Sequence, residues 1–532
     1  MTPISSPSKH PRGLYVLFFT EMWERFGYYL MLGIFSLYML DGWENGGMGF
    51  SALKKSDIYG TYLGLVYLTP FIGGLLADRV LGFRKSITMG GLLMAAGYLT
   101  LAVHDVNAFY IGLLLIILGN GMFKPNISTL VGNLYNDDKY RDNKDAGFNI
   151  FYMGINIGAF VCNFVAAYMQ INYGWGYAFA AAGIGMLIGV GIFLKGSKWV
   201  KHADIRKPLE PGDMSTSRIL LSTLVPMFIF GVLGYLIPGN LLGTDTNDAF
   251  IFGCIPVVAF FIYLYVKANE EDKRPIGALL AVFGCLVIFW AVFHQNGDAL
   301  TVWAKDYTNR EMPLAVSNVA DQAGMAQTVT NNGADTDPKS AQYFANMAPE
   351  NVPAQGQSLK LYSTQLYQSI NPFWVVLLTP VVVGFWGFMR SRKREPSTPT
   401  KIAIGLVITA LSALVMVGAV MATNNLESKA SSWWLIASYG VITVGELCLS
   451  PMGLSLVSKL SPPRITALMM GGFFLSTSVG NKLSGMLSGL WEGFEDKSWF
   501  FMMNFGLALA AALMLFMMLR WLKAVMREKN IH

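Results

Sequence analysis

Fourteen apolar runs, most of them about 20 residues long or longer, follow one another along the 532-residue chain and limit its fold more than any other feature. A helix of that length crosses the hydrocarbon of a bilayer with every backbone polar group satisfied inside the segment. Charged residues make up only 14% of the chain, whereas soluble domains carry about 25%. The sequence therefore predicts an all-α polytopic membrane protein, with spans near residues 14–40, 57–79, 85–103, 107–135, 146–170, 174–195, 218–240, 247–267, 276–303, 358–390, 399–423, 431–459, 463–490 and 497–522.

The distribution of positive charge predicts how these spans are oriented. If the N-terminus lies inside, most of the 39 Lys and Arg residues fall in the inner loops and termini. Cytoplasmic loops carry such an excess, and an even number of spans returns the chain to the same side, so we expect both termini in the cytoplasm. The net charge of +6 is then a consequence of topology. We expect the lipid bilayer, and no nucleic acid, as the large partner.

Several function classes lack their sequence signals. No phosphate-binding glycine loop and no soluble domain large enough to hydrolyse ATP is evident. We therefore expect a protein that is not an enzyme, uses no cofactor and takes its energy from an ion gradient. The first span is too long and too charged to be a cleavable signal peptide. The cysteines lie singly within spans and without metal-ligand spacing, so neither a disulfide nor a metal site is expected at Cys162, Cys254, Cys285 or Cys448.

Two segments between the spans differ from the rest in composition. Residues 196–217 form a basic, Pro-containing inner linker after the first six spans. Residues 304–357, on the expected outer side, are rich in Ala, Asn, Gln, Ser and Thr. They contain too few aliphatic residues to build a core, which predicts a flexible or partly helical insert without a core of its own.

The first span carries three charges that require an explanation. Each ionisable group near the centre of a bilayer costs roughly 3 kcal/mol even on the lenient insertion scale, so these charges must face protein or water. Glu21, Glu24, Arg25 and Tyr28 stand at i, i+3, i+4 and i+7. That spacing places two carboxylates and one guanidinium on a single stripe of a helix. The stripe is a candidate site.

Further polar and aromatic residues fall at comparable depth in other spans. Secondary transporters bind substrate at the bilayer midplane, in a cavity lined by several helices, and such a cavity would explain this arrangement. Buried asparagines could instead bond neighbouring helices, and the tyrosines could simply pack. Lys482 could also lie near enough to the end of its span to snorkel to the interface. The residues at this depth are Tyr67, Lys124, Asn156, His294, Asn371 and Glu446.

The loop between the second and third spans, residues 73–85, carries fixed charges at the expected inner surface. Asp78, Arg79 and Arg84 lie on either side of Gly82 in this loop. One interpretation is a tight turn whose arginines set the topology. A second is a gate latch, in which Asp78 and the basic residues hold helix ends together in one conformation and release them in another.

Several runs resemble the motifs of one transporter family. Residues 21–29, EMWERFGYY, resemble the E-x-x-E-R-F-x-Y-Y motif of the proton-dependent oligopeptide transporter (POT) family, a branch of the major facilitator superfamily. Residues 151–158, FYMGINIG, and 445–455, GELCLSPMGLS, resemble two further family signatures. Similar matches occur at residues 73–85, Lys124–Asn126, Asn371–Pro372 and Gly480–Asn481.

This resemblance implies the major facilitator fold, with two six-helix bundles and two extra helices of the bacterial type. The N-terminal bundle would comprise residues 1–195, and residues 196–275 would hold the linker and the extra helices. The C-terminal bundle would comprise residues 276–532, including the insert. By the same resemblance the protein would reside in the bacterial inner membrane, and we expect a monomer to be the functional unit.

The resemblance further implies proton-coupled import of di- and tripeptides by alternating access, at a site between the two bundles. Arg25 and Lys124 would face the peptide carboxylate. Asn156, Asn371 and Glu446 would orient its amino end and backbone. Glu21 and Glu24 would be the carboxylates that respond to protons. Apart from the resemblance, we also expect Arg25, Glu446 and His294 to take part in proton coupling. The remaining substrate contacts would come from Tyr28, Tyr29, Tyr67, Tyr152, Trp290 and Ser450.

The sequence departs from the family pattern in the expected seventh span. Where the family commonly has F-W-x-x-F-(D/E)-Q, this chain reads FWAVFHQ, with His294 in place of the acid. The family's pairing of that acid with the arginine of the first span cannot form here. One hypothesis is that protonation of His294 near pH 6.5 repels Arg25 and opens the outer side. The alternative is a polar residue without a role in proton transfer.

Two other functions remain open from the sequence. The chain could transport another small solute, such as a drug or an organic anion, because single motifs do not fix a substrate. It could also be a peptide sensor that does not transport, with the outer insert as its working part. Retention of the other buried charges favours transport over sensing.

Overall fold

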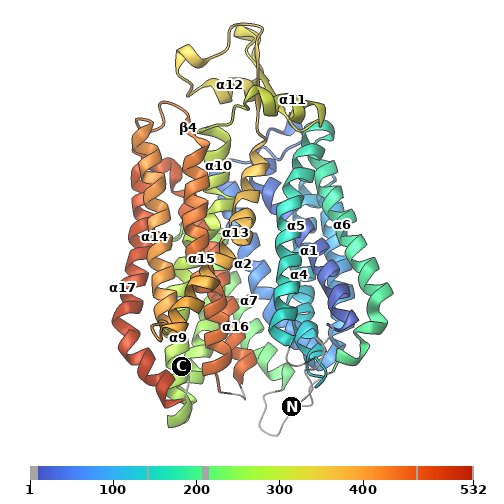
Figure 1. The fold of residues 1–532 in the computed structure, drawn as a ribbon, viewed down its shortest axis with the longest axis vertical. Coiled ribbons are helices and arrows are strands. Elements are labelled where there is room, and N and C mark those ends of the chain that lie inside the picture. Colours follow the sequence, from blue (N-terminus) through green and yellow to red (C-terminus); the bar gives the residue numbers. More distant parts are fainter. Residues whose placement is uncertain (1–9, 141–142, 206–214, 463–464, 530–532) are drawn as a thin grey trace. The chain divides into compact units, whose positions relative to one another are not determined.

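The structure is a computed structural model that describes residues 10–140, 143–205, 215–462 and 465–529. Each predicted span overlaps one long helix, and the chain is all-α apart from short strands (Figure 1). The residues group into two compact units. The first consists of residues 1–34, 44–48 and 65–221, and the second of residues 35–43, 49–64 and 222–532. Three of the described helices, α1 (Arg12–Leu40), α2 (Ala52–Leu76) and α7 (Thr216–Tyr235), therefore contribute to both units. The bundle boundaries drawn from the sequence stay a prediction.

Glycine-mediated packing dominates the first unit. The helix α3 (Phe83–Leu101) packs along both α4 (Val106–Leu134) and α6 (Trp175–Gly196). A Cβ on Gly90 would lie 2.6 Å from the carbonyl oxygen of Gly119, so the backbones of α3 and α4 touch there. Small residues permit such approaches in membrane proteins, where packing contributes more than hydrophobic burial. The helix α5 (Lys144–Tyr173) completes the unit.

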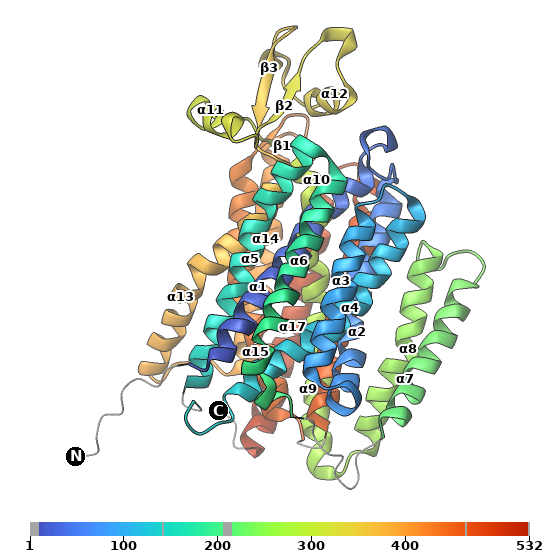
Figure 2. The same ribbon diagram turned by 90° about the vertical axis from the view of Figure 1, so that its right-hand side faces the viewer.

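The second unit contains the remaining long helices. The helix α14 packs against α15 and α17, and α16 packs against α9. The hairpin of α7 and α8 stands at the edge of this unit, where α8 contacts α9 and α16 (Figure 2). The bounds are α7 (Thr216–Tyr235), α8 (Asp245–Lys267), α9 (Glu270–Phe293), α13 (Ile370–Ser391), α14 (Thr398–Ala422), α15 (Ser432–Leu460), α16 (Thr466–Gly489) and α17 (Ser498–Glu528).

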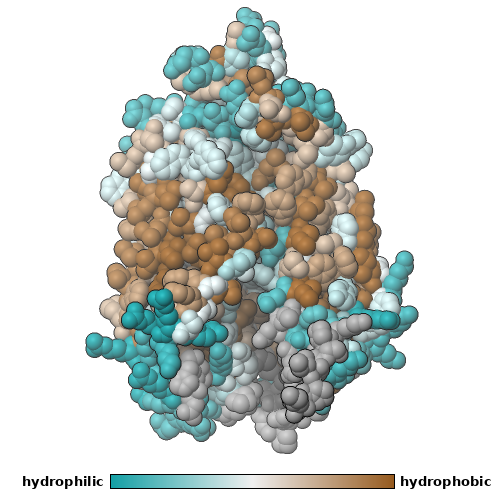
Figure 3. Space-filling view, viewed as in Figure 1, coloured by the Kyte–Doolittle hydropathy of each residue, from teal (hydrophilic) through white to brown (hydrophobic). Residues whose placement is uncertain are grey.

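The surface of the helices agrees with a multi-pass membrane protein. Ten helical segments among the described residues are long and apolar enough to cross a membrane. On the face of α13, α14, α15 and α17 that Figure 3 shows, hydrophobic residues form a band midway along the helices. Hydrophilic residues lie at both ends of this band. The count of fourteen crossings and the cytoplasmic position of the termini stay predictions.

Two predicted spans have the wrong bounds. The span predicted at 276–303 is interrupted, because α9 ends at Phe293 and a 3₁₀ turn covers His294–Gly297 before α10 (Ala299–Asp306) begins. The span predicted at 358–390 starts instead with a strand, and its helix α13 begins only at Ile370. An apolar run does not distinguish a helix from a buried strand, and side chains from elsewhere in the fold stabilise the interruption.

The insert has a small core of its own, which corrects the expectation drawn from its composition. Strands β2 (Gln327–Thr330) and β3 (Ser358–Leu361) pair antiparallel beside α11 (Leu314–Gln322) and α12 (Pro338–Phe344). The buried side chains of Val329, Tyr343 and Leu361 form the core. A parallel pairing of β1 (Thr308–Asn309) with β4 (Ala430–Ser431) joins the insert to the helices. The prediction failed because one tyrosine and buried polar contacts replace a larger aliphatic core.

Candidate functional site

The charged stripe predicted on α1 forms a buried cluster in the first unit. Glu21, Glu24 and Arg25 are at most 4% exposed. The guanidinium Nε of Arg25 lies 3.0 Å from Oε1 of Glu21 and also pairs with Glu24. Among the described residues, Arg25 Nη2 and Glu21 Oε2 have no hydrogen-bond partner. A buried polar atom left unpaired is costly, so this cluster has the capacity to bind a ligand or a proton.

Glycines on the neighbouring helices explain how three charges can be buried on α1. A Cβ on Gly158 of α5 would lie 2.3 Å from the carbonyl oxygen of Met22 and 3.3 Å from Cβ of Arg25. A Cβ on Gly154, one turn earlier, would lie 2.9 Å from the ring of Phe18. The motif in residues 151–158 therefore provides a flat helix surface against α1, and this surface excludes lipid from the charges.

A second cation of the first unit lies between α2 and α4. The Nζ atom of Lys124 is 3.9 Å from the ring centroid of Tyr67, which is within the range of a cation–π contact. The two helices approach closely, because a Cβ on Gly73 would lie 2.0 Å from the carbonyl oxygen of Gly121. Lys124 follows Gly121 by three residues, so the close crossing fixes the position of the cation.

The other predicted residues of the first unit make ring contacts or hydrogen bonds within their own helix, or are exposed. Tyr28 is buried, with its ring centroid 5.2 Å from Cζ of Arg25 and 5.4 Å from the ring of Tyr29. The Asn156 side chain donates to the carbonyl of Tyr152 at 2.9 Å, within its own helix. Tyr152 is 45% exposed. Their roles in binding stay predictions.

The predicted residues of the second unit form an acidic and amide-rich cluster. The Asn371 amide, in the first turn of α13, donates to Oε2 of Glu446 at 3.2 Å and to Oγ1 of Thr443 at 2.9 Å. Close packing of α15 on α14 positions Glu446, because a Cβ on Gly445 would lie 2.9 Å from the carbonyl oxygen of Gly405. Two further polar atoms lack a hydrogen-bond partner in the described part of the chain, Trp290 Nε1 and Ser450 Oγ.

His294 lies directly after the last residue of α9, rather than in the middle of a span. Its ring centroid is 5.2 Å from that of Trp290 at an angle of 34°, and its carbonyl oxygen accepts a hydrogen bond from the Tyr59 hydroxyl at 3.4 Å. The following residue, Gln295, is buried and exchanges amide hydrogen bonds with Asn504 of α17. The proposed action of His294 on Arg25 stays a prediction.

The predicted gate residues lie at a π-helical turn, residues Ala77–Leu81, and at the start of α3. Arg84 donates from Nε to the Ser197 hydroxyl at 2.8 Å, and the backbone of Phe83 donates to Asp204 at 2.7 Å. Arg84 thus contacts the segment after α6 in the same unit. The side chains of Asp78 and Arg79 lie outside the described residues, so the gate hypothesis stays a prediction there.

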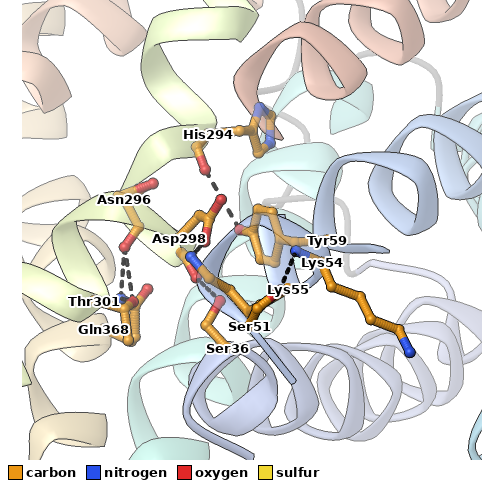
Figure 4. Close-up of polar contacts among 11 residues, drawn as sticks. Ser36, Ser51, Lys54, Lys55, Tyr59, His294, Asn296, Asp298, Thr301 and Gln368 are labelled. Carbon is orange, nitrogen blue, oxygen red and sulfur yellow. Dashed lines mark hydrogen bonds and ion pairs between the residues drawn. The ribbon is translucent and has the colours of Figure 1, made fainter. Parts of the chain in front are cut away.

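Sequence reasoning missed two buried ion pairs at the start of α2, and Figure 4 shows the one between Lys55 and Asp298. Lys55 pairs with Asp298, and the side chains are 4% and 0% exposed. Lys482 of α16 lies 2.6 Å from Asp57 and is fully buried, so the idea that it snorkels is wrong. One signal was available in the sequence, since Asp298 is an acid inside the predicted span 276–303. Lys482 is likewise a charge inside the predicted span 463–490, whereas Lys55 gave no signal because it reads as a loop residue.

Comparison with known proteins identifies the family. The POT family model matches residues 84–323 and 348–506. The chain belongs to the POT family. Over 504 residues it is 31% identical to a di-/tripeptide transporter of Lactococcus lactis subsp. lactis. The aligned segment covers 92% of this chain and 91% of the relative. It is 32% identical to the transporter YclF of Bacillus subtilis over 499 residues, covering 92% and 90% of the two chains.

Solved POT structures share the fold. The crystal structure of a peptide transporter POT in complex with sulfate superposes with a TM-score of 0.78 at 30% identity and covers 98% of this chain and 97% of that one. The two segments that match the POT family model contain Lys124, Asn156, Asn371 and Glu446. The α1 cluster lies before the first of these segments. Family membership establishes a multi-pass membrane transporter.

Proposed function

We propose that this POT protein imports di- and tripeptides together with protons by alternating access. The proton gradient supplies the energy, without a bound cofactor. The protein resides in the inner membrane with both termini in the cytoplasm and works as a monomer. The name of the Lactococcus relative supports peptides as the substrate class.

Two cations in the first unit and one carboxylate in the second carry this proposal. The first unit presents two cations, Arg25 and Lys124, whereas the second presents a carboxylate, Glu446. A peptide is a zwitterion, so its carboxylate suits Arg25 and Lys124 and its amino group suits Glu446. Trp290 Nε1 and Ser450 Oγ, which have no hydrogen-bond partner among the described residues, add a donor and a hydroxyl in the second unit for the peptide backbone. A drug or a simple anion would leave one cluster without a partner.

Proton coupling follows from competition for Arg25. The Arg25 guanidinium pairs with Glu21 and Glu24. When a peptide carboxylate takes a share of Arg25, one of these buried carboxylates loses its counter-charge and binds a proton instead. Peptide and proton then favour the same state, and this mutual dependence is what coupling requires.

Uptake of a labelled dipeptide into proteoliposomes, with and without an imposed inward proton gradient, tests the proposal. We expect accumulation only with the gradient. Glu24→Gln should keep counterflow exchange and lose accumulation, whereas Glu44→Gln, at an exposed carboxylate of the same unit, should behave as the wild type. Binding without any uptake would favour a sensor, and absence of both would contradict a peptide substrate.

A further inference from the structure

The short parallel pairing of β1 with β4 brings two cations together at the base of the insert (Figure 2). Arg310 directly follows β1, and Lys429 directly precedes β4. Both charged groups lie against one aromatic ring, since Cζ of Arg310 is 5.3 Å and Nζ of Lys429 is 4.3 Å from the ring centroid of Tyr343. The Tyr343 hydroxyl accepts a hydrogen bond from the backbone N–H of Arg310 at 3.2 Å, which fixes the ring between them.

These two cations differ from the other basic residues at the insert in having no counter-charge. Arg310 and Lys429 pair with no carboxylate in the described part of the chain, whereas three nearby lysines do. Those three pairs are Lys305–Asp306, Lys339–Asp41 and Lys360–Asp321. The unpaired Arg310 is only 3% exposed, so the charge that most needs a partner is the one without it.

The hydrogen bonds of the two cations go to neutral acceptors. Arg310 Nη1 donates to the Gln327 amide oxygen at 2.8 Å and to the carbonyl of Tyr362 at 2.7 Å, and Lys429 donates to the carbonyl of Asp306. Arg310 Nε has no hydrogen-bond partner among the described residues. A neutral acceptor or an aromatic ring returns only part of what burying an ion costs. The junction therefore lacks negative charge as well as one hydrogen-bond acceptor.

The electrostatics of the junction agree with this deficit. Burial lowers the pKa of Arg310 and lowers that of Lys429 to about 8, where the charge of Arg310 contributes as well. The Asp306 carboxylate offsets only part of this effect at both groups. Because Asp306 already supplies some negative charge, the junction suits an added anion of a single charge better than one of higher charge.

The burial of the junction restricts what could bind there. Arg310 is almost fully enclosed, so a bulky ligand would not reach its Nε atom, whereas Lys429 is half-buried and offers access from the surface. The ammonium has three donors and gives one to Asp306, which leaves donors for a ligand. Hydrogen bonds from charged donors to an anion are among the strongest that proteins make. A small anion fits these conditions.

We propose that Arg310 and Lys429 bind a small monovalent anion, chloride or a short carboxylate, at the base of the insert. The anion accepts from Nε of Arg310 and from the ammonium of Lys429, and it supplies the counter-charge that the fold does not. Its binding stabilises the junction of β1 with β4, so the stability of the insert follows the anion content of the medium. The site goes beyond peptide transport and does not depend on it.

Hydrogen exchange of the full-length protein in detergent, followed by mass spectrometry at fixed pH and ionic strength, tests the site. Replacing gluconate by chloride or by formate should slow exchange across residues 305–361. Gluconate is the reference because it is too bulky for a site at which Arg310 is enclosed. Binding reduces opening by the factor 1 + [L]/Kd, so we expect exchange to slow about tenfold at an anion concentration ten times Kd.

Two charge-removing variants assign the effect to these residues. Lys429→Gln and Arg310→Gln should each abolish the anion dependence. In gluconate, Lys429→Gln should also exchange more slowly than the wild type, because it removes one of two unpaired cations. A purely structural role of Lys429 predicts the opposite, since its bond to Asp306 is lost. Lys360→Gln breaks the exposed pair with Asp321 and is the matched control, with the full anion effect retained.

Each outcome either supports or overturns the site. Slower exchange in chloride alone, or in formate alone, supports it and identifies the ligand as a halide or a carboxylate. Equal exchange of the wild type in all three salts would overturn it. An anion effect that persists in Lys429→Gln would also overturn it, even if Arg310→Gln fails to fold, because the anion would then bind elsewhere. Absence of dipeptide uptake would contradict the transport proposal and leave this result unchanged.

Discussion

The α1 cluster and the two ion pairs at the start of α2 are both buried groups of charge, but they are built in different ways. Glu21, Glu24 and Arg25 come from one turn of a single helix. Lys55 and Asp298 are separated by 243 positions in the chain, and Asp57 and Lys482 by 425. The α1 cluster holds an excess of negative charge and unpaired atoms, whereas each ion pair of α2 is balanced. We infer that the cluster is suited to exchange partners with a ligand and that the ion pairs are suited to join distant segments of the chain.

Loss of the cation from the α1 cluster should give the largest effect. Arg25→Met leaves two buried carboxylates without a counter-charge, and removing one partner of a buried pair costs about 3–5 kcal/mol. We expect loss of peptide binding and a lower midpoint in thermal unfolding followed by size exclusion. Adding Glu21→Gln and Glu24→Gln should restore much of the stability without restoring binding. Wild-type stability of the single variant would contradict the observed burial of the cluster.

Neutralising Glu446 in the second unit should weaken peptide binding and have little effect on folding. Glu446→Gln preserves a hydrogen-bond acceptor for Asn371 but removes the charge. Affinity for a dipeptide with a free amino group should fall about tenfold or more, because a charge-assisted bond contributes roughly 1.5–3 kcal/mol. An N-acetylated dipeptide should bind equally to both proteins in calorimetry. Equal losses for both ligands would remove the assignment of Glu446 to the amino end.

The close helix crossings provide a third test. Gly158→Ala places a methyl group 2.3 Å from the carbonyl of Met22, and Gly480→Ala places one 2.5 Å from Cβ of Trp290. Each should destabilise the protein by about 1–3 kcal/mol through overpacking, with reduced transport. Gly191→Ala and Gly284→Ala are the matched controls, since no atom beyond the adjoining residues and the nearby backbone of the same helix lies within 4 Å of the added methyl. Controls that lose as much stability would contradict the packing argument.

The smallest effect concerns the insert and depends on pH. Burial, together with the charge of Arg310, lowers the pKa of Lys429 to about 8. Between pH 8 and the ordinary lysine pKa of about 10.4, the unfolded segment binds more protons than the folded one, so stability rises with pH. Hydrogen exchange of residues 305–361, corrected for its intrinsic rate, should slow modestly from pH 7.5 to pH 9. Lys429→Met should abolish this pH dependence.

The sequence predicted the long helices because an apolar run of about 20 residues has few alternatives in a bilayer. It also predicted the α1 cluster, since helical spacing places residues at i, i+3 and i+4 on one face wherever the helix lies. The glycine-containing motifs at residues 151–158 and 445–455 were also visible in the sequence, and the structure gives the reason for their glycines, because the missing side chains bring α5 and α15 against their neighbours.

The break at residues 294–298, the core of the insert and the two ion pairs of α2 came only from the tertiary structure. Each depends on groups brought together from distant parts of the chain, such as Ser36 and Gly297 or Lys55 and Asp298. Local sequence determines where a helix forms, because its hydrogen bonds are internal to the segment. Whether a buried charge is paired, or a helix can stop inside the hydrophobic span, depends on which neighbours the folded chain provides.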